Sequence, residues 1–351
     1  MDLDNAKEFG QLDPEDMLGA IRGLPQQLWK AWETAGKLPL PERREFSKIL
    51  VAGMGGSAIG ADILAGYVAA DCSVPLYVLR GYQMPAWAKG PDVLVVCSSH
   101  SGNTEETLAV FEEAQKRKCT TMTVSTGGKL SENAREQGAL CWTFDHLGQP
   151  RTAVGFSFGL LLNLLERLEL VPKQEALVKS AVAEMEALGK QIDAEVPAVK
   201  NIAKRLAGQA VERIPVVFGA EHLEPVARRW KTQINEIGKA EAQFEFIPEA
   251  DHNTLAGLVN PEALLYKTYA LFLNSERYTD RVQKRFKLTA DEFMVSGVCV
   301  DAVTCSGGSM LAEIWTAIFL GDYISYYLAM AYEVDPTPVE ALNRLKAAMK
   351  K

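Results

Sequence analysis

The chain has 351 residues, of which 48% are hydrophobic and 23% are charged, and its formal net charge at pH 7 is −8. This length and composition indicate a globular protein of about two domains, which can build its cores without disulfides or metal ions. The negative charge argues against a protein that wraps nucleic acid or lies on an anionic membrane, although a local pocket can still bind a small anion.

The cysteines and the apolar segments bear on metal binding, cellular location and membrane insertion. The six cysteines include no CxxC pair and the four histidines are scattered, so no zinc-binding spacing is present. We expect free thiols in a reducing cytoplasm, and the acidic, polar N-terminus does not resemble a signal peptide. The longest apolar stretch, 310–334, is interrupted by Glu313, Asp322 and Glu333, so it predicts a buried helix rather than a membrane span.

Strands and helices are predicted to alternate through the first half of the chain. A helix is expected first, over about residues 13–35, with Pro14 near its start and Gly36 after its end. The alternation that follows predicts a parallel sheet with helices on both faces. The predicted strands are 49–52, 76–79, 93–97, 120–124 and 139–144, and the main helices are 58–69, 105–117 and 156–170.

The same pattern begins again after a charged, amphipathic segment over 173–211. Strands are predicted at 214–219, 269–274 and 295–303, with helices at 223–233 and 280–287, a long helix over 310–334 and a short terminal helix. The similar order of elements suggests two tandem α/β domains that arose by duplication. The predicted parts are a helical extension over 1–45, a first domain over 46–170, a helical connector over 171–211, a second domain over 212–335 and a C-terminal helix over 336–351.

The first motif is GMGGSAIG at residues 53–60, between a predicted strand and a predicted helix. Its glycines let a ligand approach the backbone, and the free amides at a helix N-terminus favour an anion. The motif also fits a dinucleotide-binding turn, which requires an acidic residue about 20 positions later. Arg80 stands there instead, which argues against NAD and leaves NADP, or a tight turn without a ligand, as alternatives.

The second motif is SSHSGNTEET at residues 98–107, again between a strand and a helix. Its hydroxyls and backbone N–H groups can form a cage for a phosphate. A helix cap needs one hydroxyl, whereas this motif carries several. Ligands of open α/β sheets bind at the carboxyl ends of the strands, so two such loops at adjacent strand ends predict an anion site.

Three further positions carry charged groups. Arg151 follows the fifth strand, and a guanidinium can hold an oxyanion, although a lone arginine is more often a surface residue. Glu236 ends a predicted helix, and His252 lies on the loop after it. A carboxylate and an imidazole are the usual groups of acid–base catalysis, yet each alone is more often structural. His146 and His222 have no such context.

Together these stretches resemble a known family. GMGGSAIG and SSHSGNTEET look like the paired signatures of the sugar isomerase (SIS) domain. The tandem arrangement, with NEIGK, PEADHN and the closing GDYISYYLAMAYEVDPTPVEALNRLK, resembles the bifunctional phosphoglucose/phosphomannose isomerase family from about residue 46 to residue 346. The resemblance implies two tandem SIS domains, a sugar-phosphate substrate, no metal or other cofactor, and a homodimer.

The resemblance also implies roles for single residues. Glu236 would move the proton between C1 and C2 of the sugar, and Arg151 would stabilise the enediolate. Lys346 would assist ring opening together with His252, which can come from the partner subunit. His100 departs from the pattern, in which a Tyr or a similar residue is expected between the serines. The substrate phosphate would be held by Gly56, Ser57, Ser99, Ser101 and Thr104.

Two other functions stay open at this point. A sugar-phosphate sensor would keep the serine loop but need neither Glu236 nor His252, and the short acidic N-terminus offers no DNA-binding arm. A nucleotide-dependent oxidoreductase would leave the serine loop without a role. We therefore expect a cytoplasmic aldose–ketose isomerase of glucose 6-phosphate or mannose 6-phosphate with fructose 6-phosphate, without nucleic-acid or membrane partners.

Overall fold

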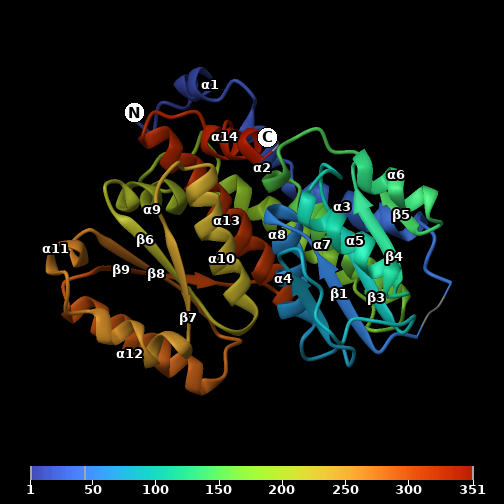
Figure 1. Ribbon diagram of the computed structural model, residues 1–351. Coiled ribbons are helices and arrows are strands. Elements are labelled where there is room, and N and C mark those ends of the chain that lie inside the picture. Colours follow the sequence, from blue (N-terminus) through green and yellow to red (C-terminus); the bar gives the residue numbers. More distant parts are fainter. Residues whose placement is uncertain (1, 43–44, 350–351) are drawn as a thin grey trace. The chain divides into compact units, whose positions relative to one another are not determined.

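The computed structural model of the protein describes residues 2–42 and 45–349 (Figure 1). The chain folds into two compact units, which we name after their sheets. The five-stranded unit comprises Gly23–Ala183 and Gly308–Ala312. The four-stranded unit comprises Met1–Arg22, Glu184–Gly307 and Glu313–Lys351. The part of the chain that the structure describes contains no helix with the length and apolar character needed to cross a membrane.

The sheet of the five-stranded unit is parallel, with the order β2-β1-β3-β4-β5. Every residue of the central strand β3 is buried, as expected where helices cover both faces of a parallel sheet. The order reverses between β1 and β3, so the loops after these two strands flank the point where ligands bind in such sheets. The strands are β1 (Lys48–Ala52), β2 (Leu76–Leu79), β3 (Val93–Ser98), β4 (Thr120–Ser125) and β5 (Leu140–Thr143).

Helices cover both faces of this sheet. One core joins alternate residues of β1 and β3 to Val110, Phe111 and Ala114 of α5 and to Leu130 and Ala134 of α6. The opposite face carries α4, against which α7 and then α3 pack. The helices are α3 (Leu24–Lys37), α4 (Gly55–Val68), α5 (Glu105–Lys116), α6 (Gly128–Glu136) and α7 (Val154–Arg167), with a 3-10 turn η2 (Pro150–Thr152) before α7.

The sheet of the four-stranded unit is also parallel, with the order β7-β6-β8-β9. This order repeats that of the first four strands of the other sheet. The crossovers from β6 to β7 and from β8 to β9 run in opposite directions, and right-handed crossovers therefore put α10 and α12 on opposite faces (Figure 1). The strands are β6 (Ile214–Gly219), β7 (Gln243–Phe246), β8 (Thr268–Ser275) and β9 (Cys299–Cys305).

The remaining helices lie in the four-stranded unit, except that α8 and α13 begin in the other unit. Trp230 of α10 donates a hydrogen bond from Nε1 to the carbonyl of Ala317 in α13, at 2.9 Å, and so joins these two helices. Phe9 packs on Tyr326 and Tyr327 of α13. The helices are α1 (Phe9–Leu12), α2 (Met17–Arg22), α8 (Glu175–Ile192), α9 (Ile202–Ala210), α10 (Glu224–Glu236), α11 (Glu262–Leu265), α12 (Asp280–Val295), α13 (Met310–Ala331) and α14 (Glu340–Met349).

The predicted α/β fold class, with two parallel sheets flanked by helices, is confirmed, whereas two element predictions were wrong and one strand was missed. The helix expected over 13–35 is two helices, α2 and α3, separated at Gly23. The strand expected over 295–303 begins at Cys299, because α12 continues to Val295 and the chain then turns at Gly297, whose φ of 82° favours glycine. Strand β7 was not predicted, and the predicted helical connector contains the separate helices α8 and α9.

Candidate active site

Three loops meet at the carboxyl end of the sheet in the five-stranded unit, and glycines allow their close approach. A Cβ atom on Gly53 would lie 2.9 Å from the carbonyl oxygen of Ser98. A Cβ atom on Gly56 would lie 2.4 Å from the carbonyl oxygen of Pro150. Both distances are too short for a side chain, so these glycines let the loop after β1 contact the loops after β3 and β5.

The serine loop, Ser98–Thr104, brings several hydroxyls together at the N-terminus of α5. Ser99 Oγ and Thr104 Oγ1 are hydrogen-bonded at 2.8 Å, and the amide of His100 donates to Ser57 Oγ at 3.1 Å. Ser101 Oγ is exposed and accepts a hydrogen bond from the amide of Asn103 at 3.2 Å. The structure thus brings the predicted phosphate ligands of α4 and of the serine loop to one helix end, where a phosphate is favoured.

Arg151 lies next to the start of α4 in the same unit. It sits in η2 with 5% of its surface exposed. Its Cα atom is 3.4 Å from the position of a Cβ atom on Gly56, so its backbone contacts the start of α4. A buried guanidinium beside an anion site can stabilise a negative oxygen, because its charge persists at all physiological pH values.

A pair of histidines connects two of these loops. His100 Nε2 and His146 Nδ1 lie 2.9 Å apart. Burial and the neighbouring His146 lower the pKa of His100 to about 4. Burial and the charge of Lys30 also lower the pKa of His146, so both imidazoles are neutral at pH 7. Sequence reasoning missed His146, because its partner lies 46 residues away along the chain.

Arg80, the residue that left NADP binding as an alternative, forms an ion pair within the same unit. Its Nη1 donates to Asp62 Oδ1 of α4 at 3.0 Å, and Nη2 contacts the other carboxylate oxygen. A guanidinium held by a carboxylate has less charge to offer a 2′-phosphate, so this ion pair gives no support to NADP binding.

Glu236 ends α10 in the four-stranded unit, where Lys239 connects it with the C-terminal segment. Lys239 Nζ donates to the carbonyl of Glu236 at 2.6 Å and to the carbonyl of Pro336 at 3.0 Å. Pro336 lies in the segment that leads to α14, which carries Lys346. Every residue of α14 is exposed, Lys346 included. The structure therefore joins the end of α10 to the segment before Lys346 and leaves the lysine on the surface.

His252 lies elsewhere in the four-stranded unit. It ends the 3-10 turn η4 (Glu249–His252) and is exposed, whereas the neighbouring Asp251 is engaged by α12. Arg285 Nη1 donates to Asp251 Oδ2, and Thr289 Oγ1 donates to Asp251 Oδ1, each at 2.7 Å. These bonds hold η4 on the α12 side of the sheet, whereas Glu236 ends a helix on the other side. Glu236 and His252 thus belong to segments that pack on opposite faces of the sheet.

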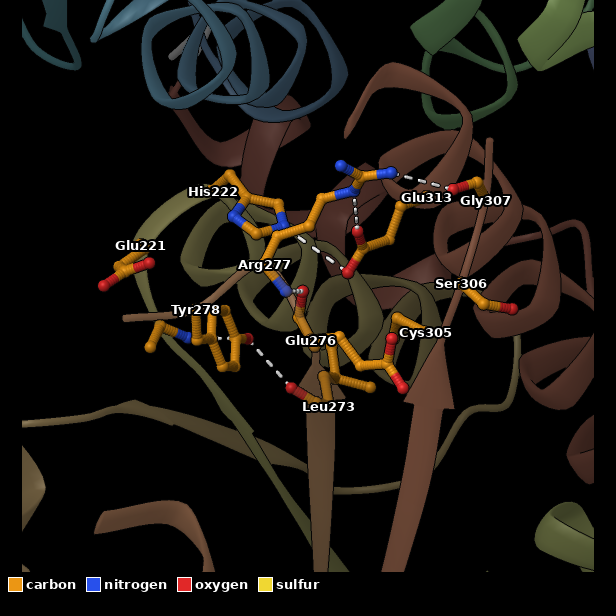
Figure 2. A network of polar contacts seen from close by, with 12 residues as sticks. Glu221, His222, Leu273, Glu276, Arg277, Tyr278, Cys305, Ser306, Gly307 and Glu313 are labelled. Atoms are coloured by element: carbon orange, nitrogen blue, oxygen red, sulfur yellow. Dashed lines mark hydrogen bonds and ion pairs between the residues drawn. The ribbon is translucent and has the colours of Figure 1, made fainter. Parts of the chain in front are cut away.

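The carboxyl end of the second sheet holds a buried carboxylate (Figure 2). Arg277 Nε lies 2.9 Å from Glu313 Oε2, and His222 Nε2 lies 3.5 Å from Glu313 Oε1. Arg277 also donates to the carbonyl of Gly307 at 2.9 Å. His222 and Glu313 are 4% and 2% exposed, so an internal carboxylate occupies the place that corresponds to the anion loops of the other sheet. Sequence reasoning assigned no role to His222.

Comparison with known proteins identifies relatives over nearly the whole chain. Residues 199–349 match the family described as the bacterial phospho-glucose isomerase C-terminal SIS domain. The bifunctional phosphoglucose/phosphomannose isomerase of Caldicellulosiruptor bescii is 35% identical, over 94% of this chain and 98% of that protein. The enzyme of the same name from Aquifex aeolicus is 32% identical, over 96% of this chain and 99% of that protein.

Solved structures share the fold. A hypothetical protein from Thermus thermophilus superimposes with a TM-score of 0.76 at 16% identity, covering 99% of this chain and 94% of that one. Tagatose-6-phosphate ketose/aldose isomerase from Escherichia coli gives 0.70 at 15% identity, covering 92% and 95%. The family predicted from the motifs is confirmed by the sequence relatives, and this chain belongs to the bifunctional phosphoglucose/phosphomannose isomerase family.

Proposed function

We propose that this chain interconverts glucose 6-phosphate and mannose 6-phosphate with fructose 6-phosphate by proton transfer through a cis-enediolate. The observation that carries the proposal is the cluster of hydroxyls at the start of α5 with the buried Arg151 beside it, in a chain whose relatives are named for this reaction. The reaction moves hydrogen within one molecule, so its balance requires no redox cofactor.

The phosphate would bind where the serine loop meets α4. Ser57, Ser99, Ser101 and Thr104 supply hydroxyls there, and Gly56 leaves room for the approach of the backbone. The phosphate is remote from C1 and C2, so the energy of binding it serves to place the reacting carbons.

In the open-chain sugar, proton transfer would pass through Glu236. Its carboxylate would remove the proton from C2 of the open-chain aldose and return it to C1, while a second proton passes from O2 to O1, which gives the ketose. The enediolate that forms between these steps carries a negative oxygen, and Arg151 would stabilise that charge. Formation of the mannose epimer requires the same base and a rotation of the substrate about the bond between C2 and C3.

Ring opening must come first, and it would use His252 and Lys346. Opening needs a proton delivered to O5 and one removed from O1, which an imidazole and an amine can do. Because His252 lies on the α12 side of the sheet, opposite Glu236, the geometry supports a homodimer in which His252 reaches the partner's site. We propose this homodimer, and a cytoplasmic location for it.

Turnover of fructose 6-phosphate tests the proposed function directly. Glucose 6-phosphate and mannose 6-phosphate should both form, as resolved by NMR spectroscopy of the product mixture, with a chelator present and no nucleotide added. If glucose 6-phosphate alone forms, the mechanism stands and the dual specificity fails. If neither forms while fructose 6-phosphate still binds, the chain is a sugar-phosphate sensor.

Lys239 provides a test of how Glu236 is held. Lys239→Met removes the two hydrogen bonds from Nζ to the carbonyls of Glu236 and Pro336, so the carboxylate should be less well placed. We expect kcat to fall roughly tenfold with a smaller change in KM, because misplacement of a reacting group by about 1 Å already has large effects. Lys284→Met, at an exposed position of α12, is the matched control. Equal kcat values for the two variants would contradict the role of Lys239.

A further inference from the structure

The hydrogen bond between His100 and His146 joins the serine loop to the loop that carries Arg151. His100 lies between the predicted phosphate ligands Ser99 and Ser101. His146 lies between β5 and η2, five residues before Arg151. The distance of 2.9 Å between His100 Nε2 and His146 Nδ1 is that of a well-formed hydrogen bond.

The backbone of His100 is fixed on the side of the serine loop. Its amide donates to Ser57 Oγ at 3.1 Å, which connects it with α4. Its carbonyl accepts hydrogen bonds from the amide and the hydroxyl of Thr126, at 2.9 Å and 2.7 Å, which connects it with the loop after β4. The imidazole of His100 therefore extends from a backbone that is held at two points.

The ring of His146 is enclosed on the side of the Arg151 loop. A Cβ atom on Gly148 would lie 2.8 Å from Cε1 of His146, so the loop closes tightly around the ring. The ring lies edge-on to Phe156 at 5.9 Å, and Phe156 stacks on Phe144 at 4.6 Å. From His146 the loop continues to η2, where the amide of Thr152 donates to the carbonyl of Gln149 at 2.9 Å.

The protonation state of the two histidines favours a stable hydrogen bond between them. Two neutral imidazoles can share one N–H···N bond, with one ring as donor and the other as acceptor. Lys30, whose ammonium lies over the Phe156 ring at 6.0 Å, disfavours a further positive charge beside His146. At neutral pH both rings are uncharged, so no repulsion between them opposes the bond.

We propose that the His100–His146 hydrogen bond sets the place of Arg151 relative to the phosphate loop, and that both histidines are positioning residues for isomerisation. The inference rests on the proposed function, in which the hydroxyls bind the phosphate and Arg151 acts at the reacting oxygen. A substrate spans these two groups, so their separation must match its length. Loss of the bond would loosen the segment from His146 to Arg151, whose far end stays tied to α3 by the bond from Gln27 Nε2 to the carbonyl of Thr152, at 2.7 Å. The serine loop would keep its bonds to Ser57 and Thr126.

Two substitutions of His146 separate the hydrogen bond from the volume of the ring. His146→Leu removes the hydrogen-bond partner of His100, whereas His146→Asn places an amide group close to the position of Nδ1, where it can accept from or donate to His100 Nε2. For His146→Leu we expect kcat with fructose 6-phosphate to fall roughly tenfold, with the dissociation constant of inorganic phosphate, from calorimetry, within about threefold of wild type. His146→Asn should keep kcat within about threefold of wild type.

Hydrogen exchange of the intact protein, followed by mass spectrometry, gives a readout that is independent of turnover. His146→Leu should speed exchange of the amides over 147–153 and leave those over 98–104 unchanged, and His146→Asn should restore slow exchange. Wild-type kcat and exchange in His146→Leu, or equal losses in both variants, would overturn the inference. Absence of turnover in the wild-type protein would overturn the proposed function instead, and exchange would still decide whether the pair holds the loop.

Discussion

Glu236→Gln is expected to reduce isomerisation strongly in both directions while fructose 6-phosphate still binds. The amide has nearly the shape of the carboxylate but cannot take up the proton from C2, so the step through the enediolate loses its base. A general base contributes about 10²- to 10⁴-fold to a rate, and kcat should fall within that range. The dissociation constant of fructose 6-phosphate, from calorimetry, should change little, because the proposed phosphate ligands lie on β1–α4 and β3–α5.

Exchange with solvent gives a second readout of the base. In heavy water the wild-type enzyme should introduce deuterium at C1 of fructose 6-phosphate, because the proton held by Glu236 can exchange before it returns. Glu236→Gln should stop this incorporation. Glu292→Gln, at an exposed position of α12, is the matched control and should behave as wild type. Full turnover or unchanged deuterium incorporation in Glu236→Gln would show that another group is the base.

Most of the fold could be predicted from local patterns. Apolar runs such as Val93–Cys97, bounded by polar turns, indicate strands buried on both faces, and the limits of β2 and β6 agree with the prediction to the residue. Strand β7 was missed because Gln243–Phe246 is a short edge strand that alternates polar and aromatic residues and lacks an apolar run. The start of β9 was misplaced because Val295, an apolar residue, is exposed at the end of a helix.

The candidate site also has one part that local sequence patterns predict and another part that they do not. The glycine and serine loops are local signals, since a strand, a turn and a helix N-terminus follow one another within a few residues. The connections between loops depend on tertiary folding and leave no local signal. His146 meets His100 from 46 residues away, and Lys239 meets Pro336 from 97 residues away. Nor could the sequence show that Arg285 and Thr289 donate hydrogen bonds to Asp251, whereas the neighbouring His252 is exposed.

Two inactive variants are expected to restore activity to each other if His252 acts in the partner's site. Glu236→Gln and His252→Ala should each be inactive alone. Their mixed dimer contains one site with both substitutions and one site with neither. Random association makes half of the dimers mixed, each with one of its two sites intact. The unselected mixture should therefore have about a quarter of wild-type activity, and the mixed dimers isolated through both tags about half, for a symmetric dimer.

The arrangement of segments around the second sheet explains why His252 is expected to act in the partner's site. Glu236 ends α10 on one face, and Asp251 holds η4 on α12 at the other face, so a movement of His252 to its own Glu236 would break the two bonds from Arg285 and Thr289. Delivery from a second copy leaves those bonds intact. The co-expressed proteins are purified together through two different tags, and turnover of fructose 6-phosphate is measured. Inactive mixed dimers, alongside active dimers of the doubly tagged wild type, would show that both residues act within one chain.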